Sequence, residues 1–172
     1  MHSSFYIVVR KMKVEDISLI ADYWLKSEPE FLENIGVDLK KLPSRKTIIE
    51  THTKEINDTS TDQNKCAVVW EFNKRSVGHS IALKNSKTAN MHLHLWDASL
   101  RKKGLGTAFV QKTIAIYFQE LQIDTLICEP KASNLAANKT LEKVGFRFLK
   151  KYLTIPGSIT YKQEVSQWQM TK

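Results

Sequence analysis

The chain has 172 residues, of which 42% are hydrophobic and 26% charged, and this composition predicts one compact globular domain over residues 1–172. Its formal net charge of +8 favours a polyanionic partner, whether a small phosphate compound, nucleic acid or an acidic membrane surface. No apolar run approaches the roughly 18 residues that span a bilayer, so a transmembrane role is not expected. The two cysteines, Cys66 and Cys128, lie far apart in apolar contexts, which argues against a disulfide framework and predicts a cytoplasmic location.

Hydrophobic spacing and turn residues divide the first part of the chain into elements. Alternation predicts strands, and apolar residues that recur about every third or fourth position predict helices. The expected elements up to position 96 are, in order, a strand over 4–9, a helix over 13–24, a loop or short helices over 28–44, a helix over 45–57, a polar turn over 58–65, and strands over 66–72, 76–83 and 89–96. The last three strands form a meander, with turns near Asn73 and Ser86.

The second part of the chain alternates between helices and strands. The expected elements are a helix over 104–119, a strand over 124–128, a helix over 133–144, a strand over 146–154, and a last strand or irregular tail over 159–170. Ser133 is the expected N-cap of the helix over 133–144, and Gly145 is its expected left-handed C-terminal cap. This order predicts a mixed α/β (α+β) fold in which flanking helices pack on a largely antiparallel sheet.

A glycine-containing loop, Arg101 to Thr107, stands where the chain passes from a predicted strand to a long helix. Gly104 and Gly106 lack the Cβ atoms that would hold a ligand away from the backbone. The free N–H groups and the dipole at a helix start bind anions, and the neighbouring cations add attraction. Between positions 99 and 151, ten Lys or Arg residues stand against four Asp or Glu, a net of +6. The pattern predicts a phosphate-binding loop, with a plain strand-to-helix turn as the alternative.

Two other nucleotide-binding loops do not fit this stretch. The P-loop has four residues between its glycines and then Gly-Lys-Ser or Gly-Lys-Thr, whereas the dinucleotide fingerprint has a third glycine in register. Neither pattern occurs around Gly104. The dinucleotide loop also belongs in the first strand-helix unit of its fold, and this loop lies past the middle of the chain.

Two motifs in sequence order resemble those of the GNAT superfamily of acetyltransferases. Arg101, Gly104 and Gly106 are similar to the Arg-x-x-Gly-x-Gly of its coenzyme A loop. A second family signature is matched, between Asn134 and Phe146, by Asn134, Ala137, Leu141-Glu142-Lys143 and Gly145-Phe146. The Leu-Glu-Lys version is closest to the subgroup that acetylates ribosomal-protein N-termini and related small-molecule acceptors. The resemblance implies an acetyl-coenzyme A-dependent N-acetyltransferase that works by direct attack of a primary amine.

The resemblance also implies where the cofactor lies. The strand that ends at Trp96 should splay from its neighbour over 124–129, which leaves a main-chain edge on which the pantetheine arm pairs. The loop should wrap the pyrophosphate, and Asn134 should contact the arm or simply order the helix start. The residues expected to bind acetyl-coenzyme A are His94, Leu95, Trp96, Arg101, Lys102, Lys103, Gly104, Leu105, Gly106, Thr107, Asn134 and Asn138.

Four side chains are candidates for the general base that acyl transfer requires. Glu129 occupies a position that resembles the base of ribosomal-protein alanine acetyltransferases, although it could equally mark the end of a strand. His92 and His94 share one face of their strand, and a neutral imidazole is a competent base near pH 7. Both could instead be structural, and Asp97 is a further competitor. No third ligand accompanies the two histidines, so no metal is expected.

Leu141 departs from the family pattern, because many members carry there a tyrosine thought to protonate the leaving thiolate. Tyr152, Tyr161 or a water molecule is the expected alternative donor. The departure also keeps open a non-catalytic acyl-coenzyme A-binding or regulatory module. A nucleic-acid partner is not expected, because the basic third of the chain lacks interleaved exposed aromatic residues. The resemblance allows a homodimer.

The acceptor is left open by the sequence among aminoglycosides, polyamines, amino acids and protein N-termini. Four acidic residues would suit a cationic amine, namely Glu28, Glu30, Glu33 and Asp38. Six ring-bearing residues are expected either to line the acceptor site or to pack in the core, namely Trp24, Phe31, Trp70, His79, Trp96 and Tyr152.

Overall fold

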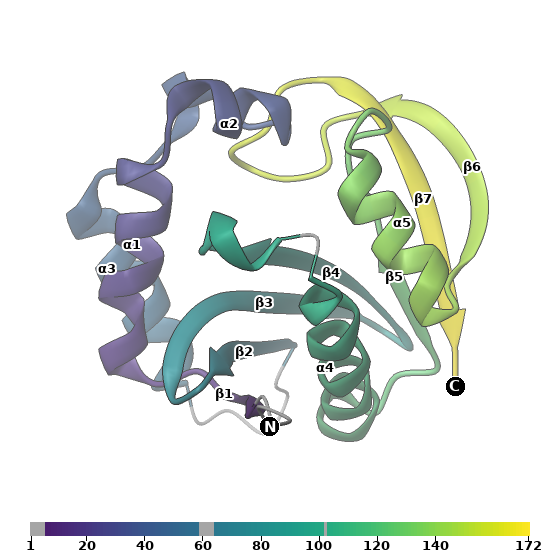
Figure 1. Ribbon diagram of the computed structural model, residues 1–172, viewed down its shortest axis with the longest axis horizontal. Helices are drawn as coiled ribbons and strands as arrows, with labels where there is room; N and C mark the ends of the chain where they lie inside the picture. Colours follow the sequence, from purple (N-terminus) through teal and green to yellow (C-terminus); the bar gives the residue numbers. More distant parts are fainter. Residues whose placement is uncertain (1–5, 59–63, 102) are drawn as a thin grey trace.

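The computed structural model describes residues 6–58, 64–101 and 103–172, and its centre is one seven-stranded sheet (Figure 1). The strands are β1 (Ile7–Lys11), β2 (Lys65–Phe72), β3 (Arg75–Asn85), β4 (Thr88–Leu95), β5 (Thr125–Cys128), β6 (Arg147–Thr154) and β7 (Gln163–Thr171). Their order across the sheet is β1-β2-β3-β4-β5-β7-β6, and each neighbouring pair is antiparallel except β4 and β5. The predicted mixed, mostly antiparallel sheet is confirmed.

Helices cover both faces of the sheet. They are α1 (Ile17–Lys26), α2 (Pro29–Asn34), α3 (Arg45–Ile56), α4 (Leu105–Leu121) and α5 (Leu135–Val144), with short 3-10 helices η1 (Val14–Asp16), η2 (Leu39–Lys41) and η3 (Ala98–Leu100). Alternation along β2 directs Val68 into the core shared with α4 and α5, whereas Val69 meets Ile20 of α1 and Ile56 of α3. α4 and α5 therefore lie on one face, and α1 and α3 on the other.

Trp70 belongs to the core and not to an acceptor site. Its side chain is 2% exposed and stacks on Phe109 of α4 with ring centroids 5.1 Å apart. Its indole N–H donates to Thr113 Oγ1 at 2.9 Å, which satisfies its one polar group. Of the two places expected for Trp70, the core is the one observed, because β2 directs this side chain under α4.

β4 and β5 separate part-way along their length, as the family resemblance implied (Figure 1). They pair only where Thr88–Met91 faces Thr125–Cys128. Beyond Met91, β4 follows β3 as far as Leu95, whereas the chain after β5 stays with β7 through a bridge between Lys131 and Val165. Each strand is thus held by its antiparallel partner, and the two separate from one another.

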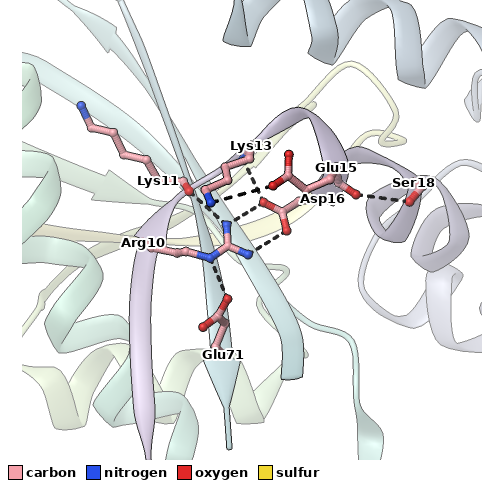
Figure 2. Close-up of polar contacts among 7 residues, drawn as sticks. All are labelled: Arg10, Lys11, Lys13, Glu15, Asp16, Ser18 and Glu71. Carbon is pink, nitrogen blue, oxygen red and sulfur yellow. Dashed lines mark hydrogen bonds and ion pairs between the residues drawn. The ribbon is translucent and has the colours of Figure 1, made fainter. Parts of the chain in front are cut away.

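A partly buried ion-pair network, centred on the buried Asp16, joins β1 and β2 to the start of the first helical segment (Figure 2). Both guanidinium Nη atoms of Arg10 donate to the carboxylate of Asp16, at 2.7 and 2.9 Å, and Nε donates to Glu71 at 2.6 Å. Asp16 also accepts the backbone N–H of Lys13 at 2.8 Å. Burial disfavours the charged form of Asp16, but these hydrogen bonds outweigh it and leave the pKa lowered.

The helix predicted over 133–144 is α5, which begins two residues later, at Leu135, and ends at Val144 as predicted. The N-cap is Asn134, whose Oδ1 accepts from the Ala137 N–H at 3.3 Å, and the expectation of Ser133 is wrong. Gly145 ends the helix at φ +104°, and Phe146 N–H returns to the Leu141 carbonyl at 3.0 Å, which is the predicted left-handed cap.

The ends of the predicted strands and turns also need small corrections. Trp96 follows β4 instead of belonging to it, and residues 155–162 form a loop before β7. The expected first strand and polar turn include positions 4, 5 and 59–63, which lie outside the described residues.

Candidate active site

The loop before α4 ends at a helix start with uncapped backbone N–H groups. Gly104 is the N-cap residue at φ +75°, a left-handed conformation that glycine adopts without strain. It has no side-chain cap, so the first-turn amides can receive an anion. A Cβ added at Gly106 would meet, within the described chain, only Thr140 atoms at 3.9 and 4.0 Å. Packing therefore does not require glycine there, and the missing side chain leaves room for a ligand.

The other residues of the loop differ in what they offer an anion. Leu105 is buried in the core, so only its backbone can serve, whereas Lys103 is exposed and Thr107 is half-buried. Lys102 lies outside the described residues. The Arg101 guanidinium carbon lies 4.3 Å from the ring centroid of Phe31, so its charge is directed to α2.

The diverging end of β4 presents main-chain groups that no neighbouring strand of the described chain pairs with. Trp96 N–H donates to the Val77 carbonyl at 2.8 Å, and Ser80 Oγ donates to the His92 carbonyl at 2.8 Å. The main-chain N–H and C=O groups of the even-numbered residues at this end of β4 therefore point toward β3. The alternation of a strand then directs the N–H and C=O of Leu93 and Leu95 away from β3, toward the side where β5 has left. Such an edge can pair with an extended chain that carries amides.

The two asparagines of α5 already have partners in the protein. Asn134 caps the helix through Oδ1, which agrees with its structural role and leaves its amide nitrogen for other contacts. Asn138 donates to the Lys131 and Asn134 carbonyls at 3.2 and 2.8 Å and accepts from Trp168 Nε1 at 2.8 Å. Its amide therefore positions β7 and the β5–α5 connection, and its predicted contact with the cofactor stays a prediction.

Glu129 follows β5 and is held by two donors. Gln167 lies opposite it on β7 and donates Nε2–H to Oε1 at 2.7 Å, while the Tyr152 hydroxyl of β6 donates to the same oxygen. Burial and this carboxylate raise the pKa of Tyr152 to about 12, so the phenol keeps its proton at neutral pH. Oε2 accepts no hydrogen bond from the described residues. Glu129 is therefore a fixed anion with one free oxygen.

His92 lies on the same sheet face as Glu129 and keeps its ring nitrogens unpartnered among the described residues. Met91 and Cys128 face the α4 core, so the next residue on each strand points to the opposite face. Burial lowers the pKa of His92 and the Glu129 charge opposes this, so the imidazole is neutral at pH 7. Its Cε1 lies 3.9 Å from the position that a Cβ on Gly157 would occupy, below the β6–β7 loop.

His94 belongs to an aromatic cluster under α1. Its Nδ1 lies 3.3 Å from the Tyr23 hydroxyl, and its ring stacks on His79 at 4.9 Å and meets Trp24 at 4.7 Å. His79 in turn accepts a hydrogen bond from Trp96 Nε1 at 2.8 Å. Burial lowers the pKa of His94 to about 3, which makes it a weak base. The two histidines therefore differ: the His92 ring nitrogens have no partner among the described residues, whereas His94 contacts Tyr23 and stacks on His79.

We expect this cluster to make the fold sensitive to acid. The folded-state pKa of His94 is about 3, below the ordinary value of 6.5, so the unfolded chain binds the extra proton as the pH falls. That stability is fully present above pH 6.5 and is lost toward pH 3. Between pH 7 and 5, urea unfolding should show wild type losing about 2 kcal/mol more than His94→Phe. Equal losses in the two proteins would contradict this role.

Other expected residues serve structural contacts. Asp97 caps η3 by accepting the Ser99 N–H at 2.9 Å and pairs with Arg75, which occupies its carboxylate. Two residues that contact the candidate bases were not predicted from the sequence, namely Tyr23, which contacts His94, and Gln167, which donates to Glu129. Tyr23 shares the buried face of α1 with Ile20, a spacing that signals burial but no polar partner. The contact of Gln167 depends on a register that sequence spacing does not reveal.

Comparison with solved structures finds the same fold in acetyltransferases. Aminoglycoside acetyltransferase AAC(6')-Ib in complex with coenzyme A aligns with a TM-score of 0.76 at 16% identity, over 97% of this chain and 95% of that one. Spermidine N-acetyltransferase from Vibrio cholerae, in complex with coenzyme A and spermine, aligns with a TM-score of 0.77 at 15% identity, over 96% and 95%. Likenesses at these identities establish the fold. No curated protein matches the sequence.

The family follows from the sequence itself. The model of the acetyltransferase (GNAT) domain matches residues 7–147, most of the chain. The chain belongs to the GNAT acetyltransferase family. It is therefore an N-acetyltransferase that uses acetyl-coenzyme A, as the two motifs implied. The uncapped start of α4 fits the pyrophosphate of this donor, and the main-chain edge at Leu93 and the Leu95 N–H fits its amide-bearing arm, whereas the Leu95 carbonyl accepts from Arg101 Nη at 3.4 Å.

Within the GNAT site, the side chain at position 141 supplies no proton. Leu141 is fully buried in the core shared with α4. Tyr161 is also engaged, because its hydroxyl donates to the Glu33 carbonyl at 2.9 Å and accepts from Lys131 Nζ at 2.6 Å. Tyr152 stays beside Glu129 as a protonated phenol whose hydroxyl donates to that carboxylate. In the described part of the chain, no helix is long and apolar enough to cross a membrane, and no three His, Cys, Asp or Glu cluster to hold a metal ion.

Proposed function

We propose that this GNAT acetyltransferase acetylates a primary amine of a small polycationic acceptor, with Glu129 binding the ammonium and His92 taking its proton. The observation that carries this is the arrangement at the diverging strands. A carboxylate held by two donors keeps one oxygen free, and an unpartnered neutral imidazole lies on the same sheet face. Both act beside the edge that fits the donor's arm.

Each residue then has a distinct task in the transfer. When bound, acetyl-coenzyme A supplies a thioester carbonyl that a free amine attacks. The Glu129 carboxylate holds the incoming ammonium through a charge-assisted hydrogen bond. His92 accepts the proton that the amine must lose, and its lowered pKa keeps it in the basic form at neutral pH. Tyr152 fixes Glu129 through its hydroxyl, and we infer that Tyr152 or a water molecule returns a proton to the leaving thiolate.

The acceptor class rests on charge and on the neighbours. Glu28, Glu30 and Glu33 lie exposed on or beside α2, and the segment after α2 bridges to the β6–β7 loop over His92. The two neighbours named above act on an aminoglycoside and on spermidine. We infer that this chain takes a polyamine or an aminoglycoside, and that it works in the cytoplasm, where its two buried thiols stay reduced.

A panel of amines tests the proposal. Coenzyme A release is measured with spermidine, kanamycin, free amino acids and neutral short peptides as acceptors. We expect kcat/KM for the best polycation to exceed that for any monoamine by at least about tenfold, because Glu129 and the α2 carboxylates attract added positive charge. Equal activity toward neutral peptides would contradict the assignment. Coenzyme A binding without turnover on any acceptor would favour the non-catalytic module.

The helix start offers a matched test of donor binding. Gly106→Leu should raise the Kd of coenzyme A at least about tenfold, because its side chain fills the space where the backbone approaches the pyrophosphate. The fold should tolerate it, since the added Cβ meets only ordinary contacts to Thr140 and leucine has the higher helix propensity. Calorimetric binding and thermal melts measure the two effects. An unchanged Kd with an unchanged melt would place the pyrophosphate elsewhere.

A further inference from the structure

We propose that Arg101, the first residue of the Arg-x-x-Gly-x-Gly loop, is a positioning residue for the acceptor side. It holds α2 against the end of β4 and does not bind the pyrophosphate. This goes beyond the loop's expected role, in which Arg101 was one of the cofactor contacts. Only the acceptor readout of its test rests on the proposed function.

The side chain of Arg101 is committed to contacts on the side opposite α4. Its guanidinium lies over the face of Phe31, with the carbon 4.3 Å from the ring centroid, a cation–π geometry. One Nη also points at the Leu95 carbonyl at 3.4 Å. Burial raises the pKa of Tyr23 while the Arg101 charge opposes this rise, so the cation also lies near that hydroxyl. The rings of Tyr23 and Phe31 meet edge to face at 6.3 Å.

These contacts connect two parts of the site that the sequence keeps far apart. Leu95 is the last residue of β4, and its carbonyl points along the edge that β5 has left. Phe31 is the third residue of α2, a helix of only six residues. A helix this short is not stable by itself, so its position depends on side chains such as Phe31. Arg101 therefore ties α2 to the edge that fits the arm of the acetyl donor.

The segment after α2 connects this helix to the β6–β7 loop on the proposed acceptor side. Val37 forms an antiparallel bridge with Thr160, and the Asp38 N–H donates to the Ile159 carbonyl at 2.8 Å. Both partners belong to the β6–β7 loop, whose Gly157 lies over His92. A shift of α2 would therefore move the loop above the candidate base. The cationic Arg101 side chain acts on the acceptor through this chain of contacts, without touching it.

The experiment compares Arg101→Ala with Lys103→Ala, because Lys103 is an exposed cation two positions along the same loop. Amide hydrogen exchange over residues 29–34 and the Kd of coenzyme A are measured first, without any acceptor. For Arg101→Ala we expect exchange to rise about fivefold with the Kd changed less than about twofold, the scale of one lost cation–π contact. For Lys103→Ala we expect the Kd of coenzyme A to rise about fivefold, with amide exchange in α2 changed less than about twofold.

Kinetics and partner variants complete the test. Arg101→Ala should raise the acceptor KM about fivefold while kcat stays within about twofold, and Phe31→Leu should do the same. The double variant should be no worse than either single one, whereas Phe31→Trp should retain the wild-type exchange. The proposal is overturned if Arg101→Ala weakens coenzyme A binding as much as Lys103→Ala, or if exchange in α2 does not change. If the wild type acetylates no amine, the proposed function is refuted. Amide exchange in α2 and the Kd of coenzyme A then still decide whether Arg101 positions α2 or binds the cofactor.

Discussion

Replacing Glu129 with glutamine is expected to lower kcat/KM for the best amine by about 10² to 10³, the range over which a positioned ionisable group contributes to proton transfer and charge stabilisation. Glutamine keeps the size and can still accept from Tyr152 and Gln167 through its carbonyl, so the local structure should persist. Only the negative charge for the ammonium is lost. The loss should appear mainly in the acceptor KM, which initial-rate kinetics separate from kcat.

Substitution of His92 should affect kcat and not the acceptor KM, the opposite of the effect expected for Glu129. His92→Gln is expected to lower kcat strongly and leave the acceptor KM near its wild-type value, because the residue acts on the proton and not on the charge. Tyr152→Phe is the matched control, since it removes one donor to Glu129 but keeps the ring, and it should cost about tenfold or less. If Glu129→Gln turns over like wild type while coenzyme A still binds, Glu129 is neither the ammonium site nor a base.

Breaking the Arg10–Asp16 pair is expected to destabilise the fold strongly (Figure 2). Asp16→Asn should lower the free energy of unfolding by about 3 kcal/mol, because it leaves the Arg10 cation without its buried partner. Since the pKa of Asp16 is lowered in the folded state, the wild type should lose this contribution as the pH falls through that pKa. Urea unfolding at pH 7 and under acid conditions measures both effects.

The neighbouring Lys13–Glu15 pair supplies the control for that substitution. It lies beside Asp16, but both side chains are largely exposed and the charged atoms are 3.8 Å apart. Glu15→Gln should therefore change the free energy of unfolding by less than about 0.5 kcal/mol. If Asp16→Asn is as mild as Glu15→Gln, the pair does not anchor η1 and α1 to the sheet.

Features with local causes were predictable from the sequence. The left-handed cap at Gly145 and the glycine loop at Gly104 need conformations that few other residues adopt, so the sequence marks them directly. The separation of β4 from β5 came from the family resemblance and is confirmed by their short pairing. The type and order of the elements followed from hydrophobic spacing, which burial enforces over many residues.

Features for which the sequence offers two equally suitable residues, or which depend on distant residues, were not predictable. Ser133 and Asn134 are both good N-caps, and only the packing of the helix selects the second. Val69 and Trp70 are both apolar, so β2 has no polar alternation to show that Trp70 faces α4. The direction of the Arg101 side chain and the two donors to Glu129 depend on residues far away in the sequence, which spacing cannot reveal.

The most direct test of the central claim is mass spectrometry of the acceptor after incubation with wild-type protein and acetyl-coenzyme A. With spermidine or kanamycin, we expect a product heavier by one acetyl group, formed in step with the released thiol and strongly reduced in Glu129→Gln. Acetylation of a primary amine in this pattern is the result that the proposed site requires. Thiol release without an acetylated amine, or acetylation that does not depend on Glu129 and His92, would contradict it.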